Sequence, residues 1–171
     1  MTGKISIRRK VYLILTVVWM AVIFSFSAKP GDESEIQSLR AGKIVCSIFV
    51  PGYENMSEQE QISMAENIDY PVRKAAHATE YAILAGFILG VVVTSLINWK
   101  HLFAAVLVAV IYASTDELHQ LFVPGRNGQF IDVLIDGTGA LAGVIFIFII
   151  YRLNNKVKSK KQNKKVKNTY N

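Results

Sequence analysis

The chain has 171 residues, of which 51% are hydrophobic, a mean hydropathy of +0.30 and a formal net charge of +6. This length fits one domain, and the apolar residues gather in long blocks, which excludes an ordinary water-soluble core. The single cysteine, Cys46, excludes an intrachain disulfide and a thiolate-ligated metal cluster.

Four apolar blocks predict four membrane-spanning helices, at about residues 11–28, 72–99, 102–122 and 130–151. A hydrocarbon core about 30 Å thick needs roughly 20 helical residues. Helices are expected because backbone polar groups cannot stay unpaired in lipid. The predicted fold class is therefore all-α: an integral membrane bundle of four transmembrane helices, with a helical outer segment between the first and the second.

The first block also has the basic flank of a secretory signal, because Arg8, Arg9 and Lys10 precede it. Its apolar stretch is longer than the roughly 7–15 residues of a signal peptide, and the small residues up to Ala28 form a weak cleavage site. We therefore expect a retained helix.

The placement of Lys and Arg predicts the orientation of the helices. Basic residues at the N-terminus, in the link that holds Lys100 and His101, and after Tyr151 lie on one side if the helices alternate. We expect that side to be the cytoplasm. The protein is then a multi-pass protein of the cell membrane with cytoplasmic N- and C-termini, and residues 29–70 lie outside.

Residues 1–151 are predicted to form the transmembrane domain, and residues 152–171 a disordered, basic cytoplasmic tail. The tail carries most of the net positive charge and is expected to meet anionic lipid. The basic composition therefore indicates membrane lipids as partners and no nucleic acid.

The outer segment contains two weak helical patterns. Residues 34–49 have an imperfect apolar stripe, which suits a helix lying on the membrane surface. After the break at Pro51 and Gly52, Ser57 and Glu60 have the spacing of a capping box and predict a second short helix.

The second predicted membrane helix begins with a polar cluster. Spacings of three and four residues place Lys74, His77 and Tyr81 on one face, with Glu80 beside His77. Alternatively, Arg73 and Lys74 snorkel to lipid headgroups, and His77 and Glu80 form a packing pair.

The third predicted helix ends in a second polar cluster, in which Tyr112, Asp116, His119 and Gln120 share a face with Glu117 at its edge. Ionisable residues inside a membrane are expensive and indicate a functional site by default. Because the second and third helices are antiparallel, both clusters are expected at the outer end, with Arg126 above them.

The fourth predicted helix carries Asp132 and Asp136 one turn apart, and the same face continues through Gly139 and Gly143. Small residues four apart allow close contact between helices. This face should therefore point into the bundle and bring its carboxylates to the other two clusters.

These three clusters resemble the VanZ-like family of membrane proteins over about residues 11–151. The resemblance implies a small multi-helix bacterial membrane protein, and the family's namesake lowers sensitivity to the glycopeptide teicoplanin. Asp136 stands where the family more often has asparagine. The residues that carry the resemblance are Arg73-Lys74-x-x-His77-x-x-Glu80-Tyr81, Asp116-Glu117-x-His119-Gln120-x-Phe122-x-Pro124-Gly125-Arg126 and Asp132-Val133-Leu134-x-Asp136-x-x-Gly139.

One hypothesis is a binding site at the outer membrane surface. Arginine and lysine would meet an anionic headgroup or phosphate, while carboxylates and an amide would bond sugar or peptide groups. The expected ligand is a lipid-linked cell-wall precursor or a glycopeptide antibiotic. The ligand-binding candidates are Arg73, Lys74, Tyr81, Gln120, Arg126, Asp132 and Asp136.

A second hypothesis is a membrane-embedded hydrolase or transferase acting on a lipid-linked envelope substrate. A divalent metal such as Zn²⁺ or Mn²⁺ would be its cofactor, with His77, Glu80, Asp116 and His119 as candidate ligands, or a histidine–carboxylate pair would serve as general base. The catalytic candidates are His77, Glu80, Asp116, Glu117 and His119. A third hypothesis is a purely structural polar network.

Overall fold

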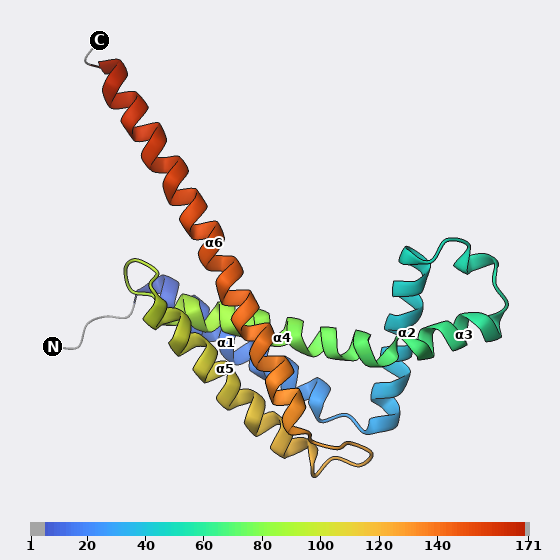
Figure 1. Cartoon of the computed structure of the whole chain (residues 1–171). Helices are drawn as coiled ribbons and strands as arrows, with labels where there is room; N and C mark the ends of the chain where they lie inside the picture. The colour runs from blue at the N-terminus through green and yellow to red at the C-terminus, as the bar shows by residue number, and fades with distance from the viewer. Residues whose placement is uncertain (1–5, 170–171) are drawn as a thin grey trace.

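The structure is a computed structural model that describes residues 6–169, with side chains as far as residue 159. Within that part of the chain every regular element is helical, which confirms the predicted fold class. Four helices, α1, α4, α5 and α6, are long and apolar enough to cross a membrane. In chain order the elements are α1 (Ile7–Ser27), α2 (Gly31–Phe49), η1 (Tyr53–Asn55), α3 (Glu58–Asn67), α4 (Asp69–Val92), α5 (Trp99–Gln120) and α6 (Phe130–Thr169) (Figure 1).

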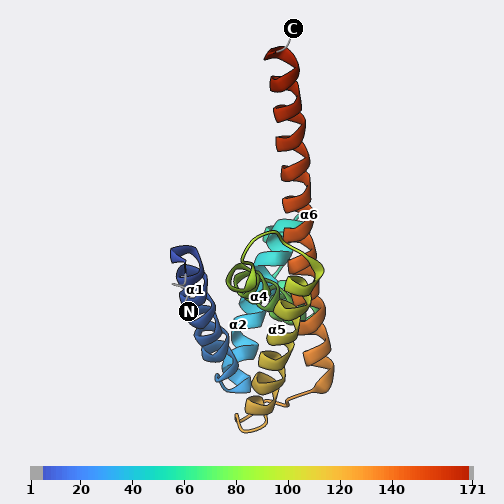
Figure 2. The same cartoon turned by 90° about the vertical axis from the view of Figure 1, so that its left-hand side faces the viewer.

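Helix α4 is the centre of the bundle, because it packs against α1, α5 and α6. Figure 2 shows α4 and α5 lying between α1 and α6. Figure 1 shows α6 crossing α4 obliquely and projecting beyond the other helices. The central position of α4 places its polar first turns beside the ends of its neighbours.

The interface between α4 and α6 is built on glycine. A Cβ atom at Gly139 would lie 2.1 Å from the carbonyl oxygen of Ala78, and one at Gly143 would lie 2.6 Å from that of Ala82. Lipid gives no hydrophobic drive for helices to associate, so close backbone approach of this kind supplies the packing contacts. The predicted role of this glycine face is therefore confirmed, and its partner is α4.

Helices α2 and α3 pack on each other and form a hairpin beside the start of α4 (Figure 1). Both predicted outer helices are present. The Ser57 hydroxyl accepts from the Glu60 amide, and the Glu60 carboxylate accepts from the Ser57 amide at 2.9 Å, which confirms the capping box. Inside the hairpin, the buried Tyr53 donates its hydroxyl hydrogen to the Gln61 carbonyl at 3.0 Å.

The predicted end of the second membrane helix at residue 99 is wrong, because α4 ends at Val92 and residues 93–98 form the link to α5. The Asn98 side chain accepts from the amides of Lys100 and His101, and an N-cap of this kind starts a helix. Lys100 and His101 therefore lie in the first turn of α5 and not in the link.

The C-terminal segment differs from the predicted disordered tail, because α6 continues to Thr169. Residues 152–169 contain neither glycine nor proline. Their many lysines are good helix formers, so nothing in this stretch interrupts the helix that the membrane segment begins.

Candidate functional site

The three predicted polar clusters meet at one end of the bundle. The Lys74 ammonium on α4 forms an ion pair with the Asp132 carboxylate on α6. The Gln129 amide at the start of α6 donates to the Glu117 carboxylate on α5 at 2.9 Å. The polar residues of α4, α5 and α6 that the sequence patterns singled out therefore belong to one site.

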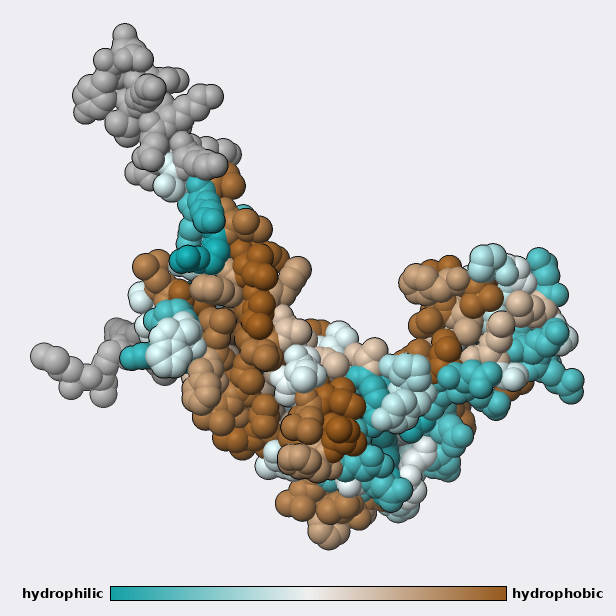
Figure 3. Space-filling model, viewed as in Figure 1, coloured by the Kyte–Doolittle hydropathy of each residue, from teal (hydrophilic) through white to brown (hydrophobic). Residues whose placement is uncertain are grey.

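A cavity of about 390 Å³, which we call the headgroup cavity, opens among α2, α4 and the loop between α5 and α6. Its volume lies within the range of roughly 300–1,000 Å³ typical of ligand pockets. Figure 3 shows hydrophilic surface gathered where α2 meets the start of α4. The predicted site residues in its lining are Arg73, Lys74, His77, Gln120, Arg126 and Asp132.

The turn from α1 into α2 and the loop after α5 are locked together. The Gly31 amide donates to the Pro124 carbonyl at 3.0 Å. A Cβ atom at Gly31 would lie 2.1 Å from the carbonyl oxygen of Gly125, which itself has a φ of 70°. Glycine is required at both positions. At Gly31 there is no space for a side chain, and Gly125 adopts a left-handed backbone conformation that favours glycine.

Arg126 lies at this junction. Its Nε donates to the Lys29 carbonyl and its Nη2 to the Phe26 carbonyl, both at 3.2 Å, and Nη2 also donates to the Ser34 hydroxyl. Among the residues with described side chains, no carboxylate lies within ion-pair distance of Arg126. Its guanidinium is therefore positioned by neutral oxygen atoms.

Burial lowers the pKa of the Arg126 guanidinium from its ordinary value, and the positive charge of Arg73 acts in the same direction. The carboxylates of Asp116, Glu117 and Glu80 oppose the shift without reversing it. The direction is that of a cation whose charge is not fully compensated by its surroundings.

The other two predicted cations already have carboxylate partners. Arg73 bonds the Asp69 carboxylate at 2.6 Å and the Ser38 hydroxyl at 3.3 Å, and Lys74 is held by Asp132. The Arg73 Nε is nevertheless buried without a hydrogen-bond partner. Both side chains line the headgroup cavity, with their charge largely balanced.

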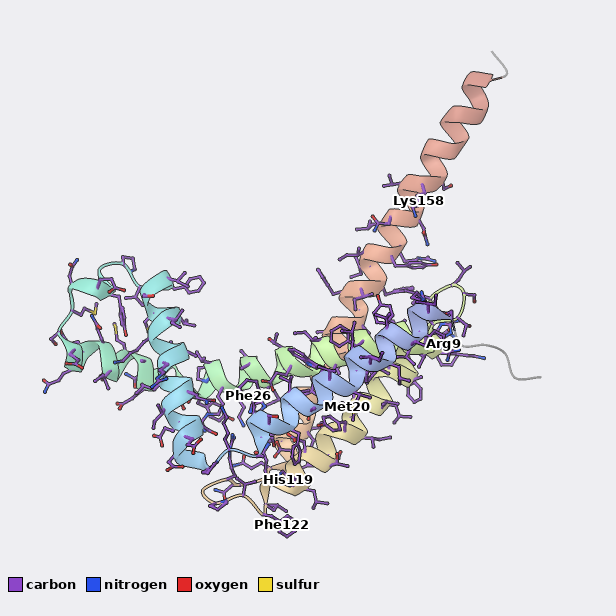
Figure 4. The ribbon with its side chains drawn as sticks, turned by 180° about the vertical axis from the view of Figure 1, so that it is seen from behind. Arg9, Met20, Phe26, His119, Phe122 and Lys158 are labelled. Carbon is purple, nitrogen blue, oxygen red and sulfur yellow. The ribbon has the colours of Figure 1, made fainter. Side chains whose placement is uncertain are left out.

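The two predicted catalytic histidines point to different places. His77 lines the headgroup cavity, and its Nδ1 lies 3.7 Å from the Glu80 carboxylate. His119 instead packs its ring against Phe24 of α1, with ring centroids 4.7 Å apart, and its Nε2 is buried without a partner (Figure 4). Only His77 is therefore placed to meet a ligand in this cavity.

Beneath the headgroup cavity lies a buried polar layer. The Gln120 amide donates to Asp116 at 3.3 Å and to Glu117 at 3.1 Å. The Tyr81 hydroxyl and one oxygen each of Asp116 and Asp136 are buried without a hydrogen-bond partner. Buried carboxylates are costly when ionised and unpaired. Only Gln120 also reaches the headgroup cavity.

The structure does not gather the four predicted metal ligands into one site. Within its described residues, no group of three or more His, Cys, Asp or Glu side chains is arranged to hold a metal ion. His77 and Glu80 stay together, while Asp116 lies in the buried layer and His119 faces α1.

The groups that hold Arg126 could not be predicted from the sequence. The carbonyls of Phe26 and Lys29 are main-chain groups, and any residue type could supply them. The turn at Pro30 and Gly31 was the one available signal, but it does not tell which loop it will contact.

The fold and the cavity define a helical membrane protein with a polar site at one end of its bundle. Residues 12–151 match the family model described as VanZ/LLP1, and the chain belongs to this family. Neither the curated proteins nor the solved structures gave a match. The family resemblance seen in the sequence motifs is therefore confirmed.

Proposed function

We propose that the headgroup cavity binds the phosphate-bearing headgroup of a lipid-linked envelope molecule. The observation that carries this proposal is Arg126, a half-buried cation on the cavity wall that three neutral oxygen atoms hold in place, without a carboxylate counterion among the described side chains. A guanidinium binds phosphate oxygens through paired hydrogen bonds. A bound phosphate would supply the missing negative charge.

The rest of the lining suits a headgroup that has more than a phosphate. Asp32, Glu35 and Asp132 accept hydrogen bonds, while Gln120 and Gln129 both donate and accept. Hydroxyls, amides or an amine of a sugar or peptide would pair with these groups. A lipid-linked cell-wall precursor combines a phosphate with such sugar and peptide groups. A glycopeptide with a lipid tail has the sugar and peptide groups but no phosphate.

The side of the membrane is part of the proposal. The basic N-terminal residues and the basic segment after Tyr151 belong to the opposite end of the bundle from the headgroup cavity. By the positive-inside rule the termini are cytoplasmic and the cavity faces outward. Outward placement supports an envelope ligand.

Binding of a long-chain polyprenyl phosphate to the purified protein in nanodiscs tests the proposal. Arg126→Gln should weaken binding at least about tenfold, because a charge-assisted hydrogen bond contributes roughly 1.5–3 kcal/mol. Arg40→Gln, an exposed site on α2, is the matched control and should bind like the wild type. Equal affinity of the two variants would reject the proposed site.

A cellular consequence follows if the lipid-linked target of a glycopeptide is the ligand. A susceptible host expressing the wild type should be protected against teicoplanin and not against vancomycin, and Arg126→Gln at matched membrane levels should lose the protection. Equal protection by the wild type and by Arg126→Gln would show that resistance does not depend on this cavity.

One observation favours a catalytic second candidate, in which a hydrolase or transferase uses His77 as general base. His77 lines the cavity, and Glu80 lies 3.7 Å from its Nδ1, where it could orient the ring. His77→Gln should then abolish phosphate release from a polyprenyl diphosphate and leave its binding intact. Absence of turnover in the wild type would leave the binding function alone.

A further inference from the structure

The headgroup cavity is the polar end of a row of hollows. A smaller cavity of about 190 Å³ shares Arg73, His77 and Arg126 with it. A groove of about 620 Å³ in turn shares Val72, Ala76 and Glu80 with the smaller cavity. The three hollows share lining residues pairwise, so they lie side by side around the first turns of α4.

The far end of this row is apolar, and we call it the chain groove. It lies where α1 and α2 flank α4, and two of these helices, α1 and α4, are long and apolar enough to cross a membrane. Its wall is made mainly of carbon, in contrast to the charged wall of the headgroup cavity. The groove is lined by Trp19, Val45, Pro71, Ala75, Thr79 and Ile83, besides the shared residues.

We propose that the chain groove holds the hydrocarbon chain of the same ligand whose phosphate lies at Arg126. This inference rests on the proposed function and adds the ligand class, an amphiphile that enters sideways from the membrane. A phosphate that reaches Arg126 leaves its chain to exit toward hydrocarbon. The smaller cavity lies between Arg126 and the chain groove, and close van der Waals packing against the groove wall is the contact available to a chain that enters from lipid.

Trp19 gives the chain groove a fixed wall. Its indole Nε1 donates to the Glu80 carbonyl at 2.9 Å. Its ring also meets Phe87 edge to face, with centroids 6.2 Å apart. A tryptophan held in this way is positioned by α4 and does not close over the groove.

Trp19 also makes the proposal measurable, because the chain contains only two tryptophans. In Trp99→Phe, Trp19 is the sole emitter, and a polyprenyl phosphate with a brominated chain should quench it saturably in nanodiscs of unbrominated lipid. Unbrominated ligand should reverse the quenching. The matched control, Trp19→Phe, keeps only Trp99, which is 69% exposed at the other end of α5 and should show no saturable quenching.

A second variant tests the chain groove without fluorescence. Ala75 is exposed in the groove wall, so Ala75→Phe should fold and partly fill the groove. It should lower affinity for the long-chain phosphate about tenfold, because the chain must then pack against a ring that overfills the groove, at a cost of roughly 1–3 kcal/mol. Affinity for geranyl phosphate, whose chain is short, should change little.

The outcomes separate the two proposals. Binding that depends on Arg126, without Trp19 quenching and without an Ala75→Phe effect on long chains, would overturn the chain groove and leave the headgroup cavity intact. Failure of every phosphate ligand to bind would overturn both. Quenching that persists in Arg126→Gln would show lipid contact unrelated to the headgroup and would also overturn the proposal.

Discussion

At the scale of single residues, the site contrasts a paired cation with one that has no counterion. Lys74 and Asp132 neutralise each other across the α4–α6 interface, with about one sixth of each side chain exposed, 16% and 17%. Arg126 has only neutral oxygen partners. The first arrangement stabilises the bundle, and the second leaves charge for a ligand.

A double-mutant cycle on Lys74→Met and Asp132→Leu tests the structural role of that pair. Each single variant should lower the free energy of unfolding, because it leaves a partly buried charge without its partner. The double variant should be more stable than the sum of the two losses predicts, by about 0.5–3 kcal/mol. Strict additivity in denaturation experiments would contradict the contact.

His119 provides a test at a residue outside the site, because its side chain faces α1 and does not line the headgroup cavity. His119→Gln should leave polyprenyl phosphate affinity unchanged and lower the free energy of unfolding by about 0.5–1.5 kcal/mol through the lost ring contact with Phe24. Isothermal titration calorimetry measures the affinity, and denaturation curves measure the free energy of unfolding. A loss of affinity in a stably folded variant would return His119 to the site.

The residues of the site could be predicted from the sequence, but which of them line the cavity, lie beneath it or face another helix could not. Helical spacing placed Asp116, His119 and Gln120 on one face. The structure divides that face, because Gln120 touches the cavity, Asp116 is buried under it and His119 meets α1. A helical wheel gives an angle around one axis, and neighbouring helices decide what lies at that angle.

At the scale of elements, the α4–α6 contact depends on the absence of side chains. Gly139→Ala and Gly143→Ala should each lower the free energy of unfolding, by about 1–3 kcal/mol, because the new methyl group meets backbone atoms that cannot move aside. Thermal unfolding in detergent measures the effect.

The matched control is Gly137→Ala on the same helix, where the new Cβ would meet only the Val110 side chain, at 3.2 Å. Alanine ordinarily favours a helix over glycine by up to about 1 kcal/mol. Gly137→Ala should therefore be near neutral. If Gly139→Ala lowers the free energy of unfolding no more than Gly137→Ala does, the tight interface is disproved.

Helix α3 should respond to pH through its capping box. The hydrogen bonds from Ser57 lower the pKa of Glu60 from its ordinary value of 4.5. A depressed folded-state pKa adds stability above the ordinary value, and that stability is lost as pH falls through the folded value. Amide hydrogen exchange in α3 should therefore accelerate in acid.

Two variants check the origin of that response. Ser57→Ala should weaken it, because the carboxylate then loses the hydroxyl that lowers its pKa most and keeps only the main-chain amide of residue 57. Glu58→Gln in the same turn should retain it. A response that is as large in Ser57→Ala as in the wild type would place its source outside the capping box.

Elements were predictable where their pattern is local. Four membrane helices follow from apolar length, and α3 follows from its capping box. The end of α4 was misplaced because apolar composition continues through the link to α5, and only the Asn98 cap marks the boundary. The extension of α6 was missed because charge was taken as a sign of disorder although lysine favours helix.

At the scale of the whole molecule, the bundle has two chemically different ends. One end gathers Lys100, Arg152 and the two arginines in the first turn of α1, Arg8 and Arg9, which donate to the carbonyls of Val93 and Val91 at the end of α4. The other end gathers the carboxylates, His77 and Arg126. The headgroup cavity, the smaller cavity and the chain groove lie side by side from the second end to the side of α4.

The position of a bound phosphate relative to Arg126 tests the central claim most directly. Rotational-echo solid-state NMR would measure dipolar coupling between ³¹P of a polyprenyl phosphate and arginine side-chain ¹⁵N in nanodiscs. We predict dephasing of the Arg126 guanidinium that disappears in Arg126→Gln and persists in Arg40→Gln. Dephasing confined to Arg8, Arg9 or Arg152, or no dephasing at saturating ligand, would contradict a phosphate site in the headgroup cavity.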